Sequence, residues 1–427
     1  MARYELFTSI DIGTRSVKAA TVGKKGEGLE LLAYAIGPSR GIEGGDIKDV
    51  IAFKESLGAV LDELERQFMR VYDSEFIVSF SSDSFDLQEV REEVALSEGE
   101  EVLITEDTVE DIKEKVLRKI SGPDTGREVY HMFTKRYLLN GNRLVFSPID
   151  MRARSLTMEL VAVSNDYSIS ESIRSTVSDI IESELNLMAS PISAAEGVLT
   201  STEKDSGVVV IELGHNFTTV IAYVNSIPIG MTMLPLGIKN VIKDIASVFG
   251  TSFDEAERLL RTRGVAMLDI TEESPEVRYK ALDGVTERIT TLQNLASVIH
   301  ARLREILNKA RRVYKSFENR IEEFRERGIP GGVVLTGGGA KINRIEDLAA
   351  SVFKSSVGVG SYSRSSPLGN PDIIGDEEAL GDPIFSPVFG NIVTFMKKYS
   401  SPVEFAPKKR TSGGLMKKIA KFFKNLL

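Results

Sequence analysis

The sequence predicts an α/β fold built from two similar lobes that face each other. Its 427 residues exceed what one hydrophobic core usually holds, which predicts two to four domains. Hydrophobic residues make up 42% of the chain and charged residues 27%, as in ordinary globular proteins. The most informative observation is a strand–turn–strand pattern near the N-terminus that returns about 200 residues later. A duplicated unit of this kind indicates two related α/β lobes.

The first copy reads FTSIDIGTRSVKAATVG. The apolar runs Phe7 to Ile12 and Val17 to Val22 predict two strands joined by a Gly-Thr-Arg-Ser turn. A third apolar run covers Leu29 to Ile36, and a helical pattern follows from about Asp49 to Val71. The second copy, GVVVIELGHNFTTVIAYVNSIPIG, keeps this order. Its predicted elements are strands at Val208 to Leu213, Thr219 to Val224 and Ile229 to Leu234, and a helix that begins near Val241.

Both copies place an acidic residue near the end of the first strand and a glycine two positions later. These residues are Asp11 and Gly13, then Glu212 and Gly214. A glycine lets the backbone approach a ligand, and successive N–H groups form a nest for anions. Two ordinary hairpins with turn-forming Asp and Gly are the alternative, but two matching copies favour phosphate binding. The further candidate phosphate ligands are Thr14, Ser16, Lys18 and Thr218.

A third glycine element strengthens this interpretation. In GGVVLTGGGAKINRIEDLAASVF, a buried strand from Val333 to Thr336 is followed by Gly337, Gly338 and Gly339, and then by a helix from about Asn343 to Phe353. A nucleotide can lie against backbone where a strand, a glycine turn and a helix N-terminus follow one another. The three glycine elements together predict a nucleotide-binding protein.

Composition excludes several other classes. There is no cysteine, so disulfides, thiolate metal sites and cysteine nucleophiles are absent. The three histidines, His131, His215 and His300, are far apart in the sequence, which argues against a zinc site. No apolar run is long enough to span a bilayer, the N-terminus lacks a signal-peptide pattern, and the acidic body argues against nucleic-acid binding.

The C-terminus has a different character. Residues 397–414 contain two prolines and two adjacent glycines, which predicts a flexible linker. Residues 397–427 hold nine Lys/Arg and one acid, a net charge of +8, which leaves −17 on the rest of a chain whose total is −9. A basic amphipathic helix on a linker suits the anionic inner face of a membrane, although docking onto the body or a partner is the alternative. The predicted membrane-binding residues are Leu415, Met416, Lys417, Lys418, Ile419, Lys421, Phe422, Phe423, Lys424, Leu426 and Leu427.

These motifs resemble those of a known superfamily. IDIGTRSVKAATV, VVVIELGHNFTTVIAY and VVLTGGGAKI are similar to the two phosphate motifs and the adenosine motif of the actin and heat-shock ATPases. SAAEGVL (Ser193 to Leu199) and FSPVFGNI (Phe385 to Ile392) resemble its two connecting helices. Within the superfamily, nearly the whole chain resembles FtsA, the bacterial division family, notably in SRGIEGGDIKD, SPISAAEGVLT and PLGIKNVIKDIA.

The resemblance implies an actin-like ATPase fold with two duplicated lobes, a nucleotide cleft between them, an FtsA-type inserted subdomain and a C-terminal amphipathic helix. A helix within SEGEEVLITEDTVEDIKEKVLRKI and two strands around Asn140-Gly141-Asn142 are predicted for the inserted subdomain. The implied boundaries are residues 1–80 and 165–200 for the first lobe, 81–164 for the inserted subdomain, 201–240 and 330–396 for the second lobe, 241–329 for its upper subdomain, 397–414 for the linker and 415–427 for the amphipathic helix.

The implied function is that of an ATP- and Mg²⁺-binding adaptor. Such a protein anchors FtsZ filaments to the cytoplasmic side of the cell membrane at the division site, polymerises with itself and can bind other division proteins. Asp11 and Glu212 would be the catalytic acids and hold Mg²⁺ through water. The family usually has Asp where Glu212 stands, and this departure predicts at most a slow ATPase. Further nucleotide-binding residues by resemblance are His215, Asn216, Phe217, Glu257 and Lys341.

A long helix is predicted in ASVIHARLREILNKARRVYKSFENRIEEF, with Val298, Leu303, Ile306, Leu307 and Ala310 as its apolar stripe. By resemblance this helix belongs to the subdomain that binds the C-terminal peptide of FtsZ, and Arg302 and Glu305 fall at matching positions. A solvated, salt-bridged face is the alternative for these charges.

Other members of the superfamily are alternatives for the whole chain. Sugar and acetate kinases share the hairpin and adenosine motifs, but a membrane-binding tail has little purpose in a soluble kinase. PilM-like scaffolds lack such a tail, and MreB-like filament proteins lack the inserted subdomain.

Overall fold

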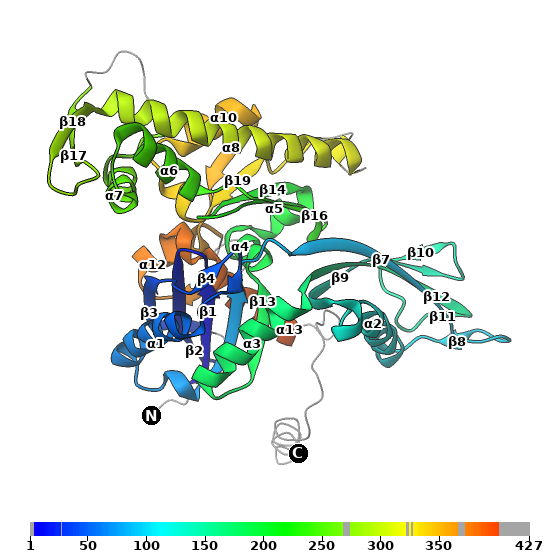
Figure 1. Cartoon of the computed structure of the whole chain (residues 1–427). Coiled ribbons are helices and arrows are strands. Elements are labelled where there is room, and N and C mark those ends of the chain that lie inside the picture. The colour runs from blue at the N-terminus through cyan, green and yellow to red at the C-terminus, as the bar shows by residue number, and fades with distance from the viewer. Residues whose placement is uncertain are drawn as a thin grey trace.

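The computed structural model describes residues 4–26, 28–267, 274–321, 324–325, 328–365 and 372–400. Two α/β lobes lie one above the other in Figure 1, and a sheet-and-helix arm projects from the side of the first lobe. The linker was predicted to begin at residue 397, but the last described helix continues to Ser400. The rest of the predicted linker and the predicted amphipathic helix at 415–427 lie outside the described residues. Within the described part of the chain, no helix is long and apolar enough to cross a membrane.

The first lobe is built on a sheet buried on both faces. Its strand order is β13-β6-β1-β2-β3-β21. Alternate residues of β1 and β2 point to opposite faces, so Ile10 and Val17 pack under α1 and α3, whereas Phe7 and Val22 pack against α13. The elements are β1 (Glu5–Ile12), β2 (Ser16–Lys25), β3 (Gly28–Pro38), β6 (Glu75–Phe80), β13 (Leu185–Ala189), β21 (Ile373–Ile374), α1 (Val50–Gln67), α3 (Tyr167–Ile181) and the short pair β4 (Ile42–Glu43) and β5 (Asp46–Ile47).

The second lobe repeats this topology. Its sheet has the order β16-β15-β14-β19-β20. In both lobes the two strands that a glycine turn joins, β1 with β2 and β14 with β15, pair antiparallel. In both sheets the first strand then pairs in parallel with a later strand, β6 or β19. The internal repeat predicted from the sequence is therefore confirmed by strand order and direction. The strands are β14 (Val208–Leu213), β15 (Thr218–Val224), β16 (Ile227–Leu234), β19 (Val333–Thr336) and β20 (Val357–Val359).

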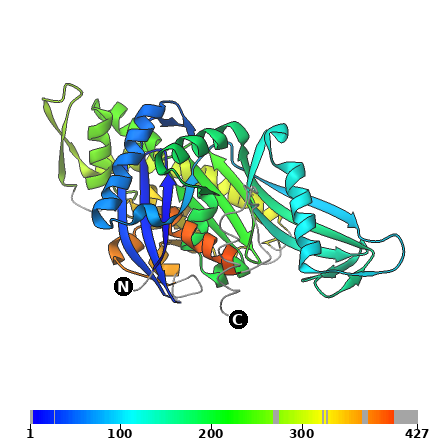
Figure 2. The same cartoon turned by 90° about the horizontal axis from the view of Figure 1, so that it is seen from below.

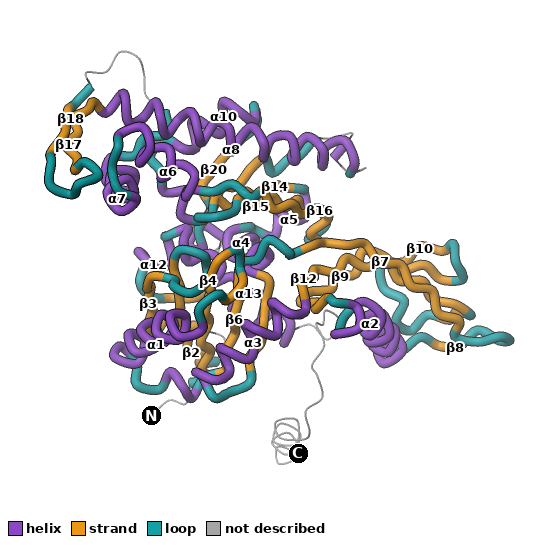
Figure 3. Tube along the Cα trace, viewed as in Figure 1, coloured by secondary structure: helices purple, strands orange, loops and turns teal. Residues whose placement is uncertain are grey.

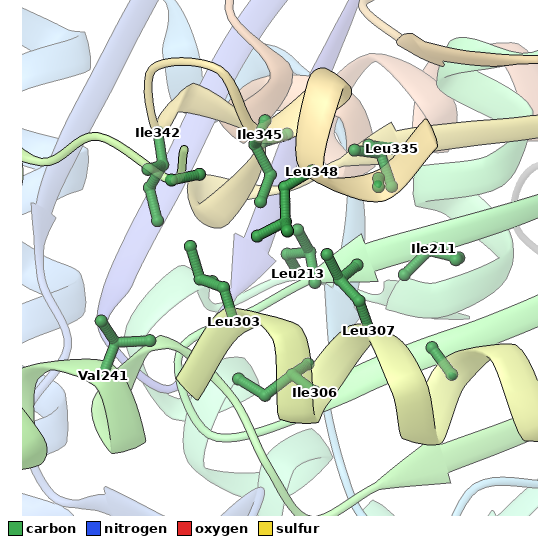
Figure 4. Close-up of a cluster of buried hydrophobic side chains, with 14 of the residues drawn as sticks. Ile211, Leu213, Val241, Leu303, Ile306, Leu307, Leu335, Ile342, Ile345 and Leu348 are labelled. Carbon is green, nitrogen blue, oxygen red and sulfur yellow. The ribbon is translucent and has the colours of Figure 1, made fainter. Parts of the chain in front are cut away.

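Helix α8 packs along the core of the second lobe. The predicted stripe residues Leu303, Ile306, Leu307 and Ala310 are fully buried, and Val298 packs at the edge of the same cluster. Figure 4 shows Leu303 and Leu307 pointing toward Leu213 of the sheet and Leu348 of α10. The helices and the hairpin of this region are α6 (Ile238–Phe249), α7 (Phe253–Arg263), β17 (Glu276–Lys280), β18 (Glu287–Thr291), α8 (Leu292–Arg320) and α10 (Ile345–Phe353).

Helices α4 (Ser190–Val198) and α13 (Ser386–Ser400) cross between the lobes, at the two segments predicted to be connecting helices. Glycines allow them to touch. A Cβ atom on Gly197 would lie 2.2 Å from the Ser386 carbonyl oxygen, and one on Gly390 would lie 1.7 Å from the Ser193 carbonyl oxygen. The shorter helices nearby are α5 (Ser201–Ser206), α11 (Tyr362–Ser365) and α12 (Glu377–Gly381).

The arm, residues 86–166, is a four-stranded sheet of order β10-β9-β12-β7 with α2 packed on one face. In Figure 2 it extends to the right, away from the first-lobe strands, and Figure 3 shows long strands with a single purple helix beside them. The helix and the strand pair predicted here are present as α2, β9 and β10. The arm's elements are β7 (Asp86–Ala95), β8 (Val102–Leu103), α2 (Glu106–Ile120), β9 (Arg127–Leu139), β10 (Arg143–Val145), β11 (Arg152–Ala153) and β12 (Ser155–Asp166).

Two helix boundaries differ from prediction for local reasons. Helix α1 ends at Gln67 instead of about Val71, because Phe68 adopts an extended backbone and a short 3-10 turn, η1 (Val71–Asp73), follows. Helix α10 begins at Ile345 instead of about Asn343, because Arg344 is left-handed with φ 62°. The triple glycine leads first into a 3-10 turn, η3 (Gly338–Lys341).

Candidate nucleotide cleft

The two duplicated turns have the same backbone geometry. The Gly13 N–H donates to the Ser16 carbonyl at 3.1 Å, and the Gly214 N–H donates to the Phe217 carbonyl at 3.0 Å. A Cβ atom on either glycine would lie 2.9 Å from that same carbonyl oxygen, closer than real Cβ contacts allow. Glycine is therefore required in both turns by close backbone approach.

The triple-glycine turn packs against the second turn on one side. A Cβ atom on Gly339 would lie 2.6 Å from both Ile238 and Leu213, and Gly337 has φ +81°, a left-handed conformation that favours glycine. Gly338 differs, because the nearest atom to a Cβ there is 4.0 Å away, on Ile384. The turn is thus held in place by its outer glycines, whereas its middle glycine is exposed and would accept a Cβ without a clash.

The acid of the first copy, Asp11, is fully partnered. It is 1% exposed, the Lys18 ammonium lies 2.5 Å from Oδ2, and the Ser79 hydroxyl donates to Oδ1 at 2.9 Å. The Asn391 amide of α13 donates to Ser79 Oγ at 3.0 Å and so connects this acid to the helix crossing. The strand register explains the ion pair, since Lys18 of β2 lies directly opposite Asp11 of β1.

The acid of the second copy, Glu212, has no such cation opposite it. Its register partner is Thr219. Burial, followed by the negative charge of Asp11, raises the pKa of Glu212 to about 7, against the opposing effect of Lys18. This electrostatic coupling means that the two acids, one from each lobe, lie close enough to repel. At neutral pH Glu212 is therefore about half protonated.

The second turn also holds unsatisfied polar atoms. Among the described residues, Asn216 Oδ1 and Thr218 Oγ1 are buried without a hydrogen-bond partner. Buried polar groups are nearly always hydrogen-bonded, so a ligand or water is expected to bind them. Burial, followed by the charge of Arg15, lowers the pKa of the neighbouring His215 to about 4, and its imidazole is neutral at pH 7.

The structure thus brings together Asp11, Lys18, Glu212 and the three glycine turns. Other predicted residues are engaged elsewhere. Lys341 forms an ion pair with Asp382, at the start of the η5 turn (Pro383–Phe385). On α8, Arg302 is bound by Asp244 of α6, with Nε–Oδ2 2.6 Å and Nη2–Oδ1 3.0 Å, and also by Glu305.

One cleft residue was not predicted. Arg15, in the first glycine turn, extends to Glu257 of α7 in the second lobe, with Nε–Oε1 2.9 Å and Nη2–Oε2 2.8 Å. The available sequence signal was a basic residue inside the first turn, where the second copy has Asn216. Its partner is 242 positions away in the sequence, so no local pattern could identify it.

These residues fit a magnesium–nucleotide ligand. The orphaned atoms of the second turn and the space at Gly338 suit phosphate and adenosine groups, respectively. In the described ranges, no cluster of three or more acidic or histidine side chains could hold a metal ion alone. Mg²⁺ usually keeps several waters and is bound by one or two carboxylates plus substrate phosphates, and the donor set of Asp11 and Glu212 matches this mode.

Comparison with solved structures defines the class. PilM, in the PilM-PilN type IV pilus biogenesis complex, aligns with a TM-score of 0.63 at 15% identity, over 95% of this chain and 100% of that one. MreB5 of Spiroplasma citri bound to AMPPNP aligns with a TM-score of 0.56 at 13% identity, over 93% and 97%. The chain therefore has an actin-like fold with two duplicated lobes, as predicted.

Sequence comparison finds similarity to the proteins of one family. A family model, Cell division protein FtsA, matches residues 209–390. FtsA of Bacillus subtilis is 28% identical over 84% of this chain and 80% of its own length, and FtsA of Borreliella burgdorferi is 26% identical over 93% and 95%. FtsA of Escherichia coli K12 is 24% identical over 90% and 89%. These matches confirm the resemblance predicted from the motifs: over most of its length the chain is similar to FtsA cell division proteins.

Proposed function

We propose that this chain binds ATP with Mg²⁺ and anchors filaments of FtsZ to the inner face of the cytoplasmic membrane during division. The observation that supports nucleotide binding best is the convergence of three glycine turns on Asp11 and Glu212, one acid from each lobe. The similarity to FtsA over most of the chain supports the role in division. Self-association into filaments is part of the proposal, since actin-like cytoskeletal proteins share this fold.

Each part of the cleft has a role in this proposal. The N–H groups of the turns at Gly13 and Gly214 hold the phosphates, with Thr14, Ser16 and Thr218 as hydroxyl donors. Gly337, Gly338 and Gly339 form the surface for adenosine. Asp11 and Glu212 would hold Mg²⁺ through water, and the ion would neutralise phosphate charge. When phosphate binds, Lys18 exchanges part of its contact with Asp11 for the ligand.

Hydrolysis is expected to be slow. The extra methylene of Glu212, compared with aspartate, moves its carboxylate by about an ångström, and misplacement on this scale can cost ~100-fold in rate. Nucleotide would then act mainly as a conformational ligand.

The proposed partner surface lies on α8. An acidic peptide at Arg302 would replace the carboxylate of Asp244, since a guanidinium binds either acid with the same paired geometry. Glu305 would be a hydrogen-bond acceptor beside it. The proposed membrane contact is the 415–427 segment, with anionic lipids opposite its lysines.

Co-sedimentation with anionic liposomes tests the adaptor role. FtsZ should pellet with the liposomes only when this protein is present, and FtsZ without its C-terminal peptide should stay in the supernatant. Deletion of residues 415–427 should release the protein from liposomes while leaving ATP binding intact. If the protein pellets but never carries FtsZ, the proposed partner is wrong. If the deletion variant still pellets, the proposed membrane segment is wrong.

A further inference from the structure

A paired ion bridge connects the two lobes across the candidate cleft. The Arg15 guanidinium faces the Glu257 carboxylate through two parallel contacts of 2.9 and 2.8 Å. The side chains are 48% and 34% exposed, so solvent reaches both partners. Arg15 belongs to the turn between β1 and β2, and Glu257 belongs to α7 of the second lobe. The contact therefore exists only while the lobes keep their present separation.

Both partners occupy positions that a nucleotide would need. Arg15 lies between the candidate phosphate ligands Thr14 and Ser16, and its charge also lowers the pKa of His215 in the second turn. Its guanidinium is thus near both phosphate turns. Glu257 is the residue that the family resemblance places at the ribose. The pair joins a group suited to phosphate with a group suited to sugar hydroxyls.

We propose that Arg15 and Glu257 form an exchangeable latch. Without nucleotide, the pair holds the two lobes together. Nucleotide binding separates it, Glu257 accepts hydrogen bonds from the ribose, and Arg15 turns to the phosphates, where it discriminates ligands by phosphate number. This inference rests on the proposed ATP binding and adds a specificity-determining residue to that site.

The arginine loses little binding energy when it exchanges the carboxylate of Glu257 for a phosphate. A guanidinium fork binds phosphate oxygens as well as it binds a carboxylate, so its paired geometry is kept. Half-exposed ion pairs are weak, and splitting this one should cost no more than about five-fold in affinity. A charged hydrogen bond to phosphate should return roughly ten-fold or more. The balance favours the exchanged state only when phosphates are present.

The first test compares affinities of the full chain for the magnesium salts of ATP, ADP and AMP. In Arg15→Ala, ATP affinity should fall about ten-fold or more while AMP affinity stays within about three-fold, because AMP offers few phosphate oxygens. In Glu257→Ala, all three affinities should fall by a similar factor, because all three carry ribose. Arg258→Ala is the matched control, since Arg258 forms an equally paired bridge with Glu255 on the same helix without joining the lobes. It should change none of the three.

The second test measures lobe separation directly. The chain has no cysteine, so spin labels on Met69→Cys and Val285→Cys would be unique, and both parent side chains are more than 80% exposed in different lobes. Without ligand, Arg15→Ala and Glu257→Ala should each lengthen or broaden the distance between the labels. The double variant Arg15→Glu with Glu257→Arg should restore the ligand-free distance but not the preference for ATP.

The outcomes separate this inference from the proposed function. If the unmodified chain binds none of the three nucleotides, the proposed function fails and the latch fails with it. If it binds ATP while Arg15→Ala changes neither the ATP-to-AMP ratio nor the ligand-free distance, the latch alone is wrong. A swapped pair that does not restore the distance would also overturn it.

Discussion

Replacing Glu212 with glutamine is expected to remove a pH-dependent proton release that accompanies magnesium–nucleotide binding. With a pKa of about 7, Glu212 carries about 0.9 proton at pH 6, about 0.5 at pH 7 and about 0.1 at pH 8. Water-mediated Mg²⁺ binding requires the carboxylate form, so this proton must leave on binding. Titration calorimetry in buffers of different ionisation enthalpy measures the number released. Subtracting the number measured for Glu212→Gln from that of the unmodified chain leaves the protons that Glu212 releases, because the protons of the nucleotide contribute equally to both.

The same pKa predicts the stability of the ligand-free protein. Because the folded pKa lies above the ordinary value of 4.5, the folded state binds the proton more tightly. The free energy of unfolding should therefore fall as pH rises from 4.5 to about 7, by at most roughly 3 kcal/mol, and stay level above that. Glu212→Gln should lack this decrease in urea unfolding. A proton release that does not vary with pH, or that is unchanged in the glutamine variant, would refute the reasoning.

Three further predictions concern packing, a buried charge and the partner surface. Gly390→Ala should lower the unfolding free energy by about 1–3 kcal/mol or more, because its Cβ would meet the Ser193 carbonyl at 1.7 Å. Gly338→Ala should leave thermal stability unchanged but weaken ATP binding, because the nearest atom to its Cβ would be 4.0 Å away. Burial would raise the pKa of Glu196, but Lys397 and Lys204 outweigh it and lower this pKa to about 2. Glu196→Gln should therefore cost roughly 3 kcal/mol in urea unfolding at pH 7, and the difference should shrink as pH falls from 4.5 toward 2; an equal cost at pH 3 and pH 7 would contradict this. Arg302→Ala should weaken capture of the FtsZ peptide in a pull-down about ten-fold, whereas Arg304→Ala, an exposed arginine two positions on, should not; equal losses would point to a general charge effect.

The sequence predicted most of the elements that form the two lobes. Strands β14 and β19 have the predicted bounds, because short apolar runs flanked by glycines leave little freedom in where a strand begins and ends. Helix α1 was predicted too long, since Phe68 and Val71 continue its apolar spacing after the helix has ended. The repeat itself was recognisable because both turns need glycine for the same backbone reason.

The electrostatics of the cleft could not be predicted in the same way. The raised pKa of Glu212 arises first from burial and then from the charge of Asp11, which is about 200 positions away in sequence and in the other lobe. The pairs Arg15–Glu257 and Arg302–Asp244 are likewise long-range. They show that Glu257 and Arg302, which were predicted to bind a ligand or partner, each have an ion-pair partner within the chain. Sequence pattern gives the local backbone, whereas these charges depend on how the lobes are placed. The roles of the individual site residues and the membrane segment stay predictions.

The crossing of α4 and α13 has a mechanical consequence. At Gly197 and Gly390 the two helices meet through backbone atoms, with no side chain interposed. The spacing of the two helices is therefore set by backbone atoms, while buried side chains such as Val388 and Phe389 hold α13 against the first lobe. Asn391, one residue beyond Gly390, donates to Ile10 and Ser79, beside the first acid. A shift of α13 would thus be transmitted to the strand end that carries Asp11, so the position of this helix and the hydrogen bonds around the first acid depend on each other.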